Sequence, residues 1–392
     1  MIAPTKSHAG RFRPFVYAAV VYLLVLQVGA LVLNVPIALR GGGDFPSFYR
    51  AGLMVRSGAG RSLYGIDAQV RYESTFLPRN GERIQLYYHP AFQALAVAPL
   101  TFLPYKVAYW VWSVAGLGAL LLAARLLAPE LGNLSEAAGM PVWLIFLCFF
   151  PVANTILQGQ DSLFLFALLA FAYREFRRER EVMAGVALGL ALFKFQYIVP
   201  LIFILALLRW RPKLLLFSGA MALLLAGISW AVVGNSGAIA YWHLTQHHQP
   251  EHNWQMMNLR GLVMTLGGSR WLVIVLSLAL AFWCGFREMA RGSREFLAAL
   301  VAAVLVSYHM HVYDMSIVLI PLAVMMDEAL KDKAWKRLLL PGVFWVTPLY
   351  GLLLHTDLYF LFSLPLLAML YVLPLWCQNS RWERKVVPAA TA

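Results

Sequence analysis

Residues 14–44 read PFVYAAVVYLLVLQVGALVLNVPIALRGGGD, an apolar run from Pro14 to Leu39 that ends in arginine, three glycines and an aspartate. About 20 apolar residues in an α-helix cross a bilayer, so this run predicts a membrane-spanning first helix. Lys6, Arg11 and Arg13 precede it, as in a signal peptide, but the apolar core is about twice as long as a signal peptide's. We therefore expect an uncleaved helix followed by a glycine-rich turn at the membrane surface.

The composition places the rest of the chain in the membrane as well. Of its 392 residues, 61% are apolar and 13% are charged, whereas soluble domains are about 45–50% apolar and about 25% charged. This excludes a water-soluble monomer. The net charge of +13 would suggest nucleic acid in a soluble protein, but in a multi-pass membrane protein it is the excess that cytoplasmic loops carry. We expect membrane lipids around the chain and no nucleic-acid partner.

Apolar runs predict an all-α polytopic protein of about twelve membrane helices in a single domain over residues 1–392. After the first helix they lie at about 105–127, 140–157, 161–173, 182–194, 196–208, 214–233, 270–285, 296–307, 315–330, 338–354 and 358–377. With a cytoplasmic N-terminus, 21 Lys and Arg fall in inner segments, 10 in outer ones and Lys194 within a span. The positive-inside rule therefore favours cytoplasmic termini.

Two long segments are predicted on the outer side. Residues 40–104 form the first, and its end, YHPAFQALAVAPLTFLP at 88–104, is apolar but interrupted by three prolines. A full span here would invert the orientation of everything after it, so a re-entrant or surface-lying helix fits the charges better. Residues 234–269 form the second segment, a polar loop rich in His, Gln and Asn.

Metal and redox chemistry find little support in the sequence. Cys148, Cys284 and Cys377 are far apart and lie in or at the end of apolar segments, which favours packing. No HExxH motif is present, and His309 and His311 are spaced i,i+2, which does not share a helix face. We expect no metal and no cofactor.

Polar residues at the predicted outer ends of the spans are the candidate site, because ionisable groups in apolar surroundings are expensive. Asp44 either caps the next helix or acts as a general base at the membrane rim. Gln160 and Asp161 lie in a turn that needs polar residues anyway. Lys194 either snorkels to the headgroups or binds a phosphate of the substrate.

Two further turns on the same side carry charge. Arg260, in NLRGL, suits a phosphate through its planar guanidinium, although an arginine bound to lipid phosphate looks the same in sequence. His309, His311 and Asp314, in SYHMHVYD, form the other turn. We expect the histidines to contact substrate and Asp314 to orient one of them.

At these positions the chain resembles the GT-C superfamily of polyprenyl-phosphate-dependent glycosyltransferases, and within it glycosyltransferase family 87, whose known members are bacterial mannosyltransferases. The resemblance covers nearly the whole chain and rests on short motifs: Asp44-Phe45, Phe48 to Gly52, Ser62-Leu63-Tyr64, Tyr88-His89-Pro90 to Pro104, Gly159-Gln160, the Gly185 to Lys194 helix, Asn258 to Gly261, and His309 to Asp314. The chain departs from the family pattern at His89, at Phe195 and over Asn253 to Met256, where the family usually has Pro, Pro and Asn-Gln-Ser-Leu.

The resemblance implies a GT-C type helical bundle whose long first outer loop carries juxtamembrane helices. It implies transfer of one sugar, mannose by analogy, from a β-linked polyprenyl phosphate to a hydroxyl of a glycolipid or glycan, at the extracytoplasmic face of a bacterial inner membrane. Asp44 is the expected catalytic base. Tyr49, His89, Asn258 and Gln160, which lie in these motifs, are expected to contact substrate together with Lys194, Arg260, His309, His311 and Asp314.

The mechanism expected is an inverting displacement, which needs one base, whereas a retaining one would also need a carboxylate nucleophile. Two alternatives remain open on the sequence. A secondary transporter would carry its charges near the bilayer midplane, and a polyprenyl-linked glycan ligase would transfer a whole glycan rather than one sugar.

Overall fold

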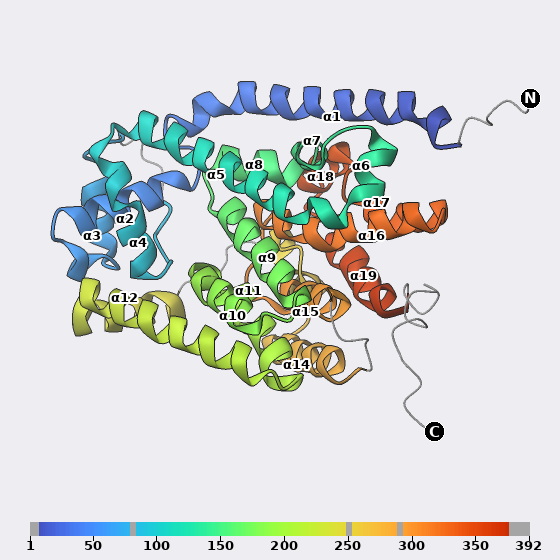
Figure 1. The fold of residues 1–392 in the computed structure, drawn as a ribbon. Coiled ribbons are helices and arrows are strands. Elements are labelled where there is room, and N and C mark those ends of the chain that lie inside the picture. Colours follow the sequence, from blue (N-terminus) through green and yellow to red (C-terminus); the bar gives the residue numbers. More distant parts are fainter. Residues whose placement is uncertain (1–7, 79–83, 248–252, 288–292, 376–392) are drawn as a thin grey trace, which may run out of the picture.

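The computed structural model describes residues 8–78, 84–247, 253–287 and 293–375, and every regular element in them is helical (Figure 1). The bundle consists of α1 (His8–Ala38), α5 (Tyr105–Leu127), α6 (Gly132–Ala138), α7 (Val142–Leu147), α8 (Phe150–Gln158), α9 (Ser162–Arg177), α10 (Glu181–Leu190), α11 (Phe195–Ile202), α12 (Pro212–His247), α14 (Arg270–Phe286), α15 (Ser293–Val306), α16 (Leu319–Lys331), α17 (Leu339–Val343), α18 (Thr347–His355) and α19 (Ser363–Leu375). Lys6 and Cys377 lie outside the described residues.

The outer faces of several helices are apolar, which confirms a membrane protein. Leu33 on α1 is 76% exposed and Leu223 on α12 is 77% exposed. Exposed apolar side chains are spread along both helices, and patches of this extent are rare on soluble monomers. Lipid is the medium that covers such surfaces without cost.

Fewer helices have spanning length than the twelve apolar runs predict. By length and composition, four helical runs in the described part of the chain could cross a bilayer: Val16–Ala38, Tyr105–Glu130, Glu181–Leu208 and Pro212–Gln246. The bent pair Trp335–Trp345 and Thr347–His355 makes five if it counts as one span. Many of the other apolar runs form short or broken helices, such as α15 with 14 residues, about 21 Å long against about 30 Å of hydrocarbon.

The run Glu181–Leu208 folds back on itself. Glu181 at its start pairs with Arg211 just past its end, with 2.8 Å between Oε1 and Nη1. A straight helix of this length would separate the two by about 40 Å. Lys194, with φ −114° and ψ 60°, marks the break, so Lys194 lies at the tip of a helical hairpin formed by α10 and α11.

The first outer segment is a helical module with its own hydrophobic core. It contains α2 (Phe45–Arg56), α3 (Ile66–Glu73) and α4 (Ala91–Val97), which continues as a short 3-10 helix to Phe102. The continuous helix Ala91–Phe102 is about 18 Å long, too short to cross a bilayer, as the proline pattern predicts. Core residues of the module include Phe48, Met54 and Tyr87.

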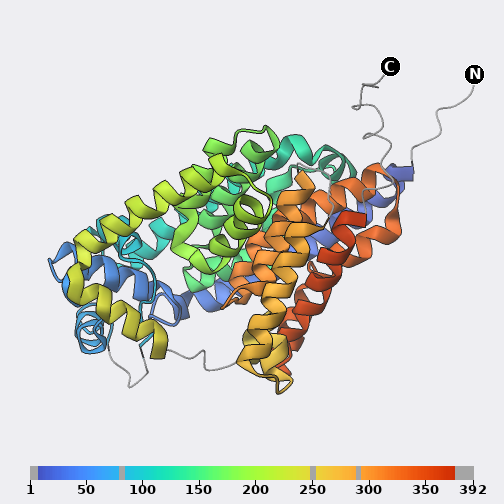
Figure 2. The ribbon, with the colours of Figure 1, turned by 90° about the horizontal axis from the view of Figure 1, so that it is seen from below.

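The second outer segment is more helical than a polar loop. α12 continues to His247 after a break at Gly234, where φ is 63° and ψ is −173°, and α13 (Leu259–Thr265) follows. The end of α12 packs on the first outer module (Figure 2), where the rings of Tyr64 and Tyr241 lie 4.6 Å apart. The first part of the predicted polar loop over 234–269 is therefore helical, and a glycine at positive φ makes the kink between the two helical parts of α12.

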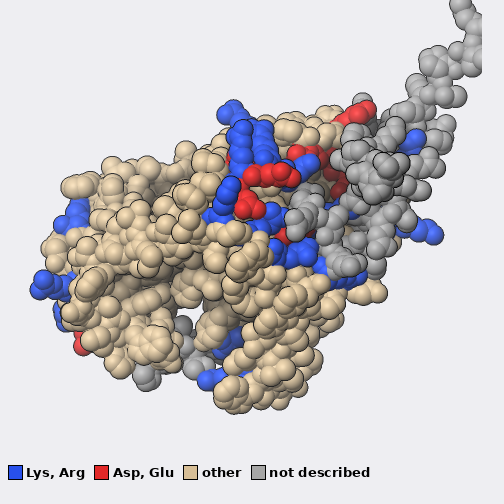
Figure 3. All heavy atoms as spheres, turned by 60° about the horizontal axis from the view of Figure 1, so that its bottom comes forward, with Lys and Arg blue, Asp and Glu red and all other residues tan. Residues whose placement is uncertain are grey.

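Most ion pairs gather at the bundle end opposite Asp44. Arg211 pairs with Glu295 at 2.6 Å as well as with Glu181, and Arg177 pairs with Glu130. Arg177, Glu181 and Glu295 lie at the ends of α9, α10 and α15 that are remote from Asp44. Arg211 directly precedes α12, and Glu130 ends the short 3-10 turn after α5. In Figure 3 acidic and basic side chains likewise gather in one region of the face shown.

Candidate active site

Asp44 sits at the N-cap position of α2, but its side chain makes no capping hydrogen bond. Its Oδ2 instead accepts a hydrogen bond of 2.6 Å from Nε2 of Gln160. Its backbone N–H donates to the carbonyl of Gln158 at 2.8 Å. The structure therefore rules out a side-chain cap and joins the turn after α1 to the turn between α8 and α9.

Gly159 makes this junction possible. It adopts φ 64° after the end of α8, and a Cβ at this position would collide with Phe45 at the start of α2. Trp112 on α5 donates from Nε1 to the Gly159 carbonyl at 3.0 Å. A left-handed glycine thus lets the two turns approach closely, which places Gln160 against Asp44.

Lys194 is buried between two carboxylates rather than extended to solvent. Its Nζ lies 2.5 Å from Oδ1 of Asp314 and 2.9 Å from Oδ1 of Asp161, and it donates to Oγ of Ser162 at 2.9 Å. Only 2% of its side chain is exposed. A buried charge needs such partners, so the snorkelling interpretation is wrong.

Gln160 links the lysine to Asp44. Its Oε1 lies 3.4 Å from Lys194 Nζ, and its Nε2 faces Asp44. Because an ammonium has only donors and a carboxylate only acceptors, this is the amide orientation that satisfies both contacts. Lys194, Gln160 and Asp44 therefore form one hydrogen-bonded row.

Asp314 has partners other than those the sequence predicts. Ser162 donates to its Oδ1 at 2.8 Å and Tyr197 donates to its Oδ2 at 2.8 Å. Asp314 and His311 also bond each other: the Asp314 backbone N–H donates to the His311 side chain, and the Asp314 side chain accepts from the His311 backbone N–H at 3.5 Å. Asp314 therefore contacts Lys194, Tyr197 and the His311 ring.

The surroundings of Asp44 raise the pKa of its carboxyl group. Burial away from water raises its pKa to about 6, while the hydrogen bond from Gln160 and the charge of Lys194 lower it, and the charges of Asp314 and Asp161 raise it. A general base works best with a pKa near the working pH. A carboxyl with this pKa is therefore chemically suited to accept a proton near neutral pH.

Arg260 belongs to a second cluster, built on the segment that follows α15. Its guanidinium lies 4.0 Å from the centre of the Tyr308 ring and donates to the Tyr308 carbonyl at 3.4 Å. No carboxylate in the described part of the chain pairs with it. Asn258 caps α13, accepting from Gly261 N–H at 3.0 Å and donating to the Ser307 carbonyl at 2.6 Å.

The two histidines lie between these clusters. The rings of His309 and His311 are 4.2 Å apart, edge to face. Burial lowers the pKa of both, and for His309 the neighbouring His311 lowers it further. Both are therefore neutral at pH 7 and offer N–H donors rather than charge. Among the described residues no group of His, Cys, Asp or Glu is arranged to hold a metal ion.

His89 and Tyr49 lie on the outer module. His89 Nδ1 is 3.9 Å from Oδ2 of Asp161, so His89 adjoins the lysine cluster, and its pKa is lowered by burial. Tyr49 is buried and donates to the Leu103 carbonyl at 2.8 Å, with Tyr105 and Phe76 packed on its ring. Tyr49 therefore packs inside the module.

Three members of the cluster are not among the candidate residues that the sequence analysis names. They are Gln93, whose Nε2 donates to Asp161 Oδ2, together with Ser162 and Tyr197. A polar residue inside the apolar run of 88–104 was a usable signal for Gln93. Ser162 reads as an ordinary turn residue and Tyr197 as a core aromatic, so neither stands out in sequence.

Comparisons with known proteins agree with this picture. The family model for glycosyltransferase family 87 matches residues 87–312, which include His89, Gln160 and Lys194. No curated protein and no solved structure shows a significant match. Asp44 lies before the matched range and Asp314 just after it. Since the match covers more than half of the 392 residues, the chain belongs to glycosyltransferase family 87 and is a membrane glycosyltransferase.

Proposed function

We propose that this protein transfers a single sugar, mannose, from a polyprenyl phosphate to a hydroxyl of a glycolipid or glycan acceptor. The reaction takes place at the extracytoplasmic face of a bacterial inner membrane, with both termini cytoplasmic. One observation carries the proposal: the Asp44 side chain does not cap α2 and instead accepts a hydrogen bond from Gln160.

Asp44 acts as the general base. The acceptor oxygen attacks the anomeric carbon, the bond from that carbon to the phosphate oxygen breaks, and Asp44 takes the acceptor's proton. The polyprenyl phosphate leaves with the bonding electron pair. A phosphate leaving group needs no protein acid, so one carboxylate is enough.

The pairing of the other two carboxylates supports an inverting reaction. Asp161 and Asp314 both contact Lys194, which makes them poor nucleophiles. A retaining mechanism needs a second free carboxylate beside the first, and Asp44 has none in these contacts. We therefore propose single displacement with inversion.

Arg260 binds the donor phosphate in this proposal, aided by neutral N–H donors from His309 and His311 and by Asn258. It is a buried cation with no carboxylate partner among the described residues. A guanidinium donates to phosphate in a bidentate manner. Lys194, which the sequence also nominates for the phosphate, is already engaged by two carboxylates. His89 stays a proposal as a substrate contact, whereas the hydroxyl of Tyr49 is bonded to the Leu103 carbonyl.

The test is Asp44→Asn in purified full-length protein with a polyprenyl phosphate sugar and an acceptor. Loss of a general base lowers turnover by about 10²–10⁴-fold, with donor binding retained. Asp67→Asn, an exposed carboxylate on α3 of the same module, is the matched control and keeps full activity. Wild-type activity in Asp44→Asn would remove Asp44 from its role.

Donor and product are tested separately. Arg260→Ala should weaken the apparent affinity for the polyprenyl phosphate donor, and an unchanged affinity contradicts our assignment. Mass spectrometry of the product should show an increment of one hexose rather than of a whole glycan. Activity that depends on a nucleotide sugar and not on polyprenyl phosphate would overturn the donor assignment.

A further inference from the structure

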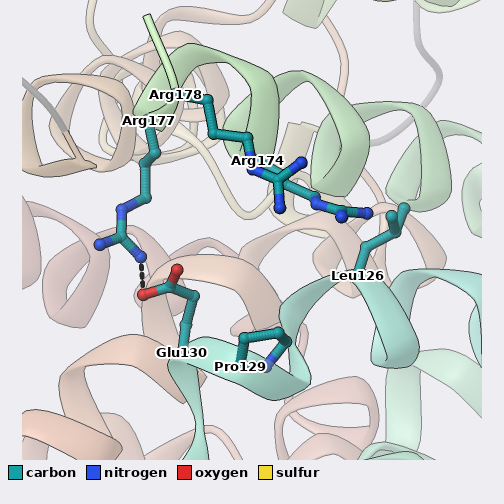
Figure 4. Close-up of a pocket in the computed structure, with 6 residues that line it drawn as sticks. All are labelled: Leu126, Pro129, Glu130, Arg174, Arg177 and Arg178. Atoms are coloured by element: carbon teal, nitrogen blue, oxygen red, sulfur yellow. Dashed lines mark ion pairs between the residues drawn. The ribbon is translucent and has the colours of Figure 1, made fainter.

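A cavity of about 130 Å³ lies where α9 ends, beside the short 3-10 turn Ala128–Glu130 that follows α5. Its lining consists of Leu126, Pro129, Glu130, Arg174, Arg177 and Arg178 (Figure 4). One water needs only about 10–15 Å³ of such space, so a larger group fits. α9 is about 24 Å long, and Asp161 lies at its other end. The cavity is therefore separate from the candidate active site.

The lining carries more positive than negative charge. Arg174, Arg177 and Arg178 are three and four residues apart, which places them on one face of the helix. Arg177 turns to Glu130 and forms an ion pair with it (Figure 4). Glu130 is the one carboxylate that lines the cavity.

The neighbouring carboxylate does not neutralise the remaining two arginines. Glu175 contacts Arg178 at 3.6 Å, but it also contacts Arg180 at 3.4 Å. Among the described residues Arg174 pairs with no carboxylate. Guanidinium groups brought together in this way repel one another unless an anion lies between them.

Apolar surface continues from the cavity toward the lipid. Leu126 and Pro129 form part of its wall, and Leu121 and Leu122, one turn earlier on α5, are 41% and 52% exposed. A ligand that enters here meets charge at one end and a lipid-facing helix at the other. Such a site suits an amphiphile better than a free ion.

We propose that this cavity binds the phosphate headgroup of an anionic phospholipid at the membrane surface opposite Asp44. Arg174 and Arg178 donate hydrogen bonds to the phosphate oxygens, as guanidinium groups do in bidentate fashion. Arg177 is fixed by Glu130 and forms the side wall. The acyl chains lie along the exposed leucines of α5.

The experiment adds phosphatidylglycerol, phosphatidylcholine or inorganic phosphate to the purified full-length protein and measures bound lipid by native mass spectrometry and the unfolding midpoint. We expect retention of phosphatidylglycerol over phosphatidylcholine. Arg174→Gln and Arg178→Gln should each weaken phosphatidylglycerol binding about tenfold, because each variant loses charge-assisted hydrogen bonds to the phosphate. Arg125→Gln removes an exposed arginine of α5 outside the lining and should change it less than twofold.

A variant that is expected to bind phosphatidylglycerol more tightly distinguishes the proposal from simple misfolding. Glu130→Gln removes the single lining carboxylate and should tighten phosphatidylglycerol binding. Equal binding of the two lipids, an equal loss in Arg125→Gln, or weaker binding in Glu130→Gln would overturn the proposal. So would inorganic phosphate that stabilises the protein as much as phosphatidylglycerol does, because the ligand would then be a free anion.

Discussion

At the scale of single residues, the hydrogen bond between Gln160 and Asp44 sets the protonation of the proposed base. A donor to a carboxylate stabilises its charged form and lowers its pKa, here against the opposing effect of burial. Gln160 can do this because Lys194 holds the other end of its amide. We therefore regard Gln160 as a positioning residue for Asp44.

A pH profile tests this. Asp44 must be ionised to accept a proton, and its pKa is raised to about 6, so turnover should fall as the pH drops through 6, about tenfold by pH 5. Gln160→Leu removes the bond that favours the carboxylate, so the acid limb should move to higher pH. Gln27→Leu, which removes a buried glutamine bonded to Thr347 and Cys148, should leave the limb in place. A profile of Gln160→Leu that matches the wild type would contradict the role of Gln160.

Lys194 has a stability role that can be separated from phosphate binding. Lys194→Met leaves Asp161 and Asp314 buried without a countercharge, which costs about 3–5 kcal/mol, so the unfolding midpoint in detergent should fall. Lys194→Met combined with Asp314→Asn should recover part of the loss. Lys106→Met, an exposed lysine on α5, should have little effect. Unchanged stability with weaker donor binding would instead make Lys194 a phosphate ligand.

At the scale of elements, the aspartates at the N-termini of two helices turn their side chains toward the site and do not cap their own helices. Neither Asp44 at α2 nor Asp161 at α9 makes a side-chain capping bond. Aspartate at an N-cap is usually a capping residue, and sequence alone leaves that interpretation open. The close approach of the turns around Gly159 gives these carboxylates other partners.

Substitution of Gly159 should therefore separate the two turns. Gly159→Ala places a Cβ against Phe45 at a positive φ, which strains the backbone by about 1–2 kcal/mol before any clash. We expect lower stability and a larger loss of turnover, measured by thermal unfolding and transfer assays. Gly118→Ala on α5 has open space around its Cβ position and should be neutral or stabilising by up to about 1 kcal/mol. Similar behaviour of the two variants would show that the junction tolerates movement.

The same scale explains why the number of apolar runs and the number of long helices among the described residues differ. Hydropathy detects that residues 182–194 and 196–208 are apolar, but the length of each helix and its bend depend on packing. Here the turn at Lys194 is stabilised by carboxylates from α9 and from the segment after α15. The two apolar runs and the reversal between them are thus predictable from sequence, whereas the carboxylates that hold the turn are not.

At the scale of the whole molecule, the orientation predicted from Lys and Arg can be tested by labelling. With a membrane-impermeant maleimide on intact spheroplasts, Glu136→Cys on α6 should react only after lysis, because the positive-inside rule places it in the cytoplasm. Asp67→Cys on α3 should react without lysis. Cys148 and Cys284 are buried and give little background. Labelling of Glu136→Cys from outside would invert the topology.

The sequence by itself determined the solvent, the family and the list of polar candidates. Its apolar fraction requires a bilayer, its motifs identify a glycosyltransferase, and its polar turns point to Asp44, Gln160 and Lys194. These properties are local, since each depends on composition or on a few neighbouring residues.

Only the tertiary structure decided which candidates act together. Lys194 and Asp314 are 120 residues apart in the chain and meet at 2.5 Å, and Gln160 reaches Asp44 across 116 residues. Such pairings depend on how helices pack, so local sequence does not encode them visibly. They make Lys194 the countercharge of Asp161 and Asp314, and they place Gln160 against Asp44, the base that we propose.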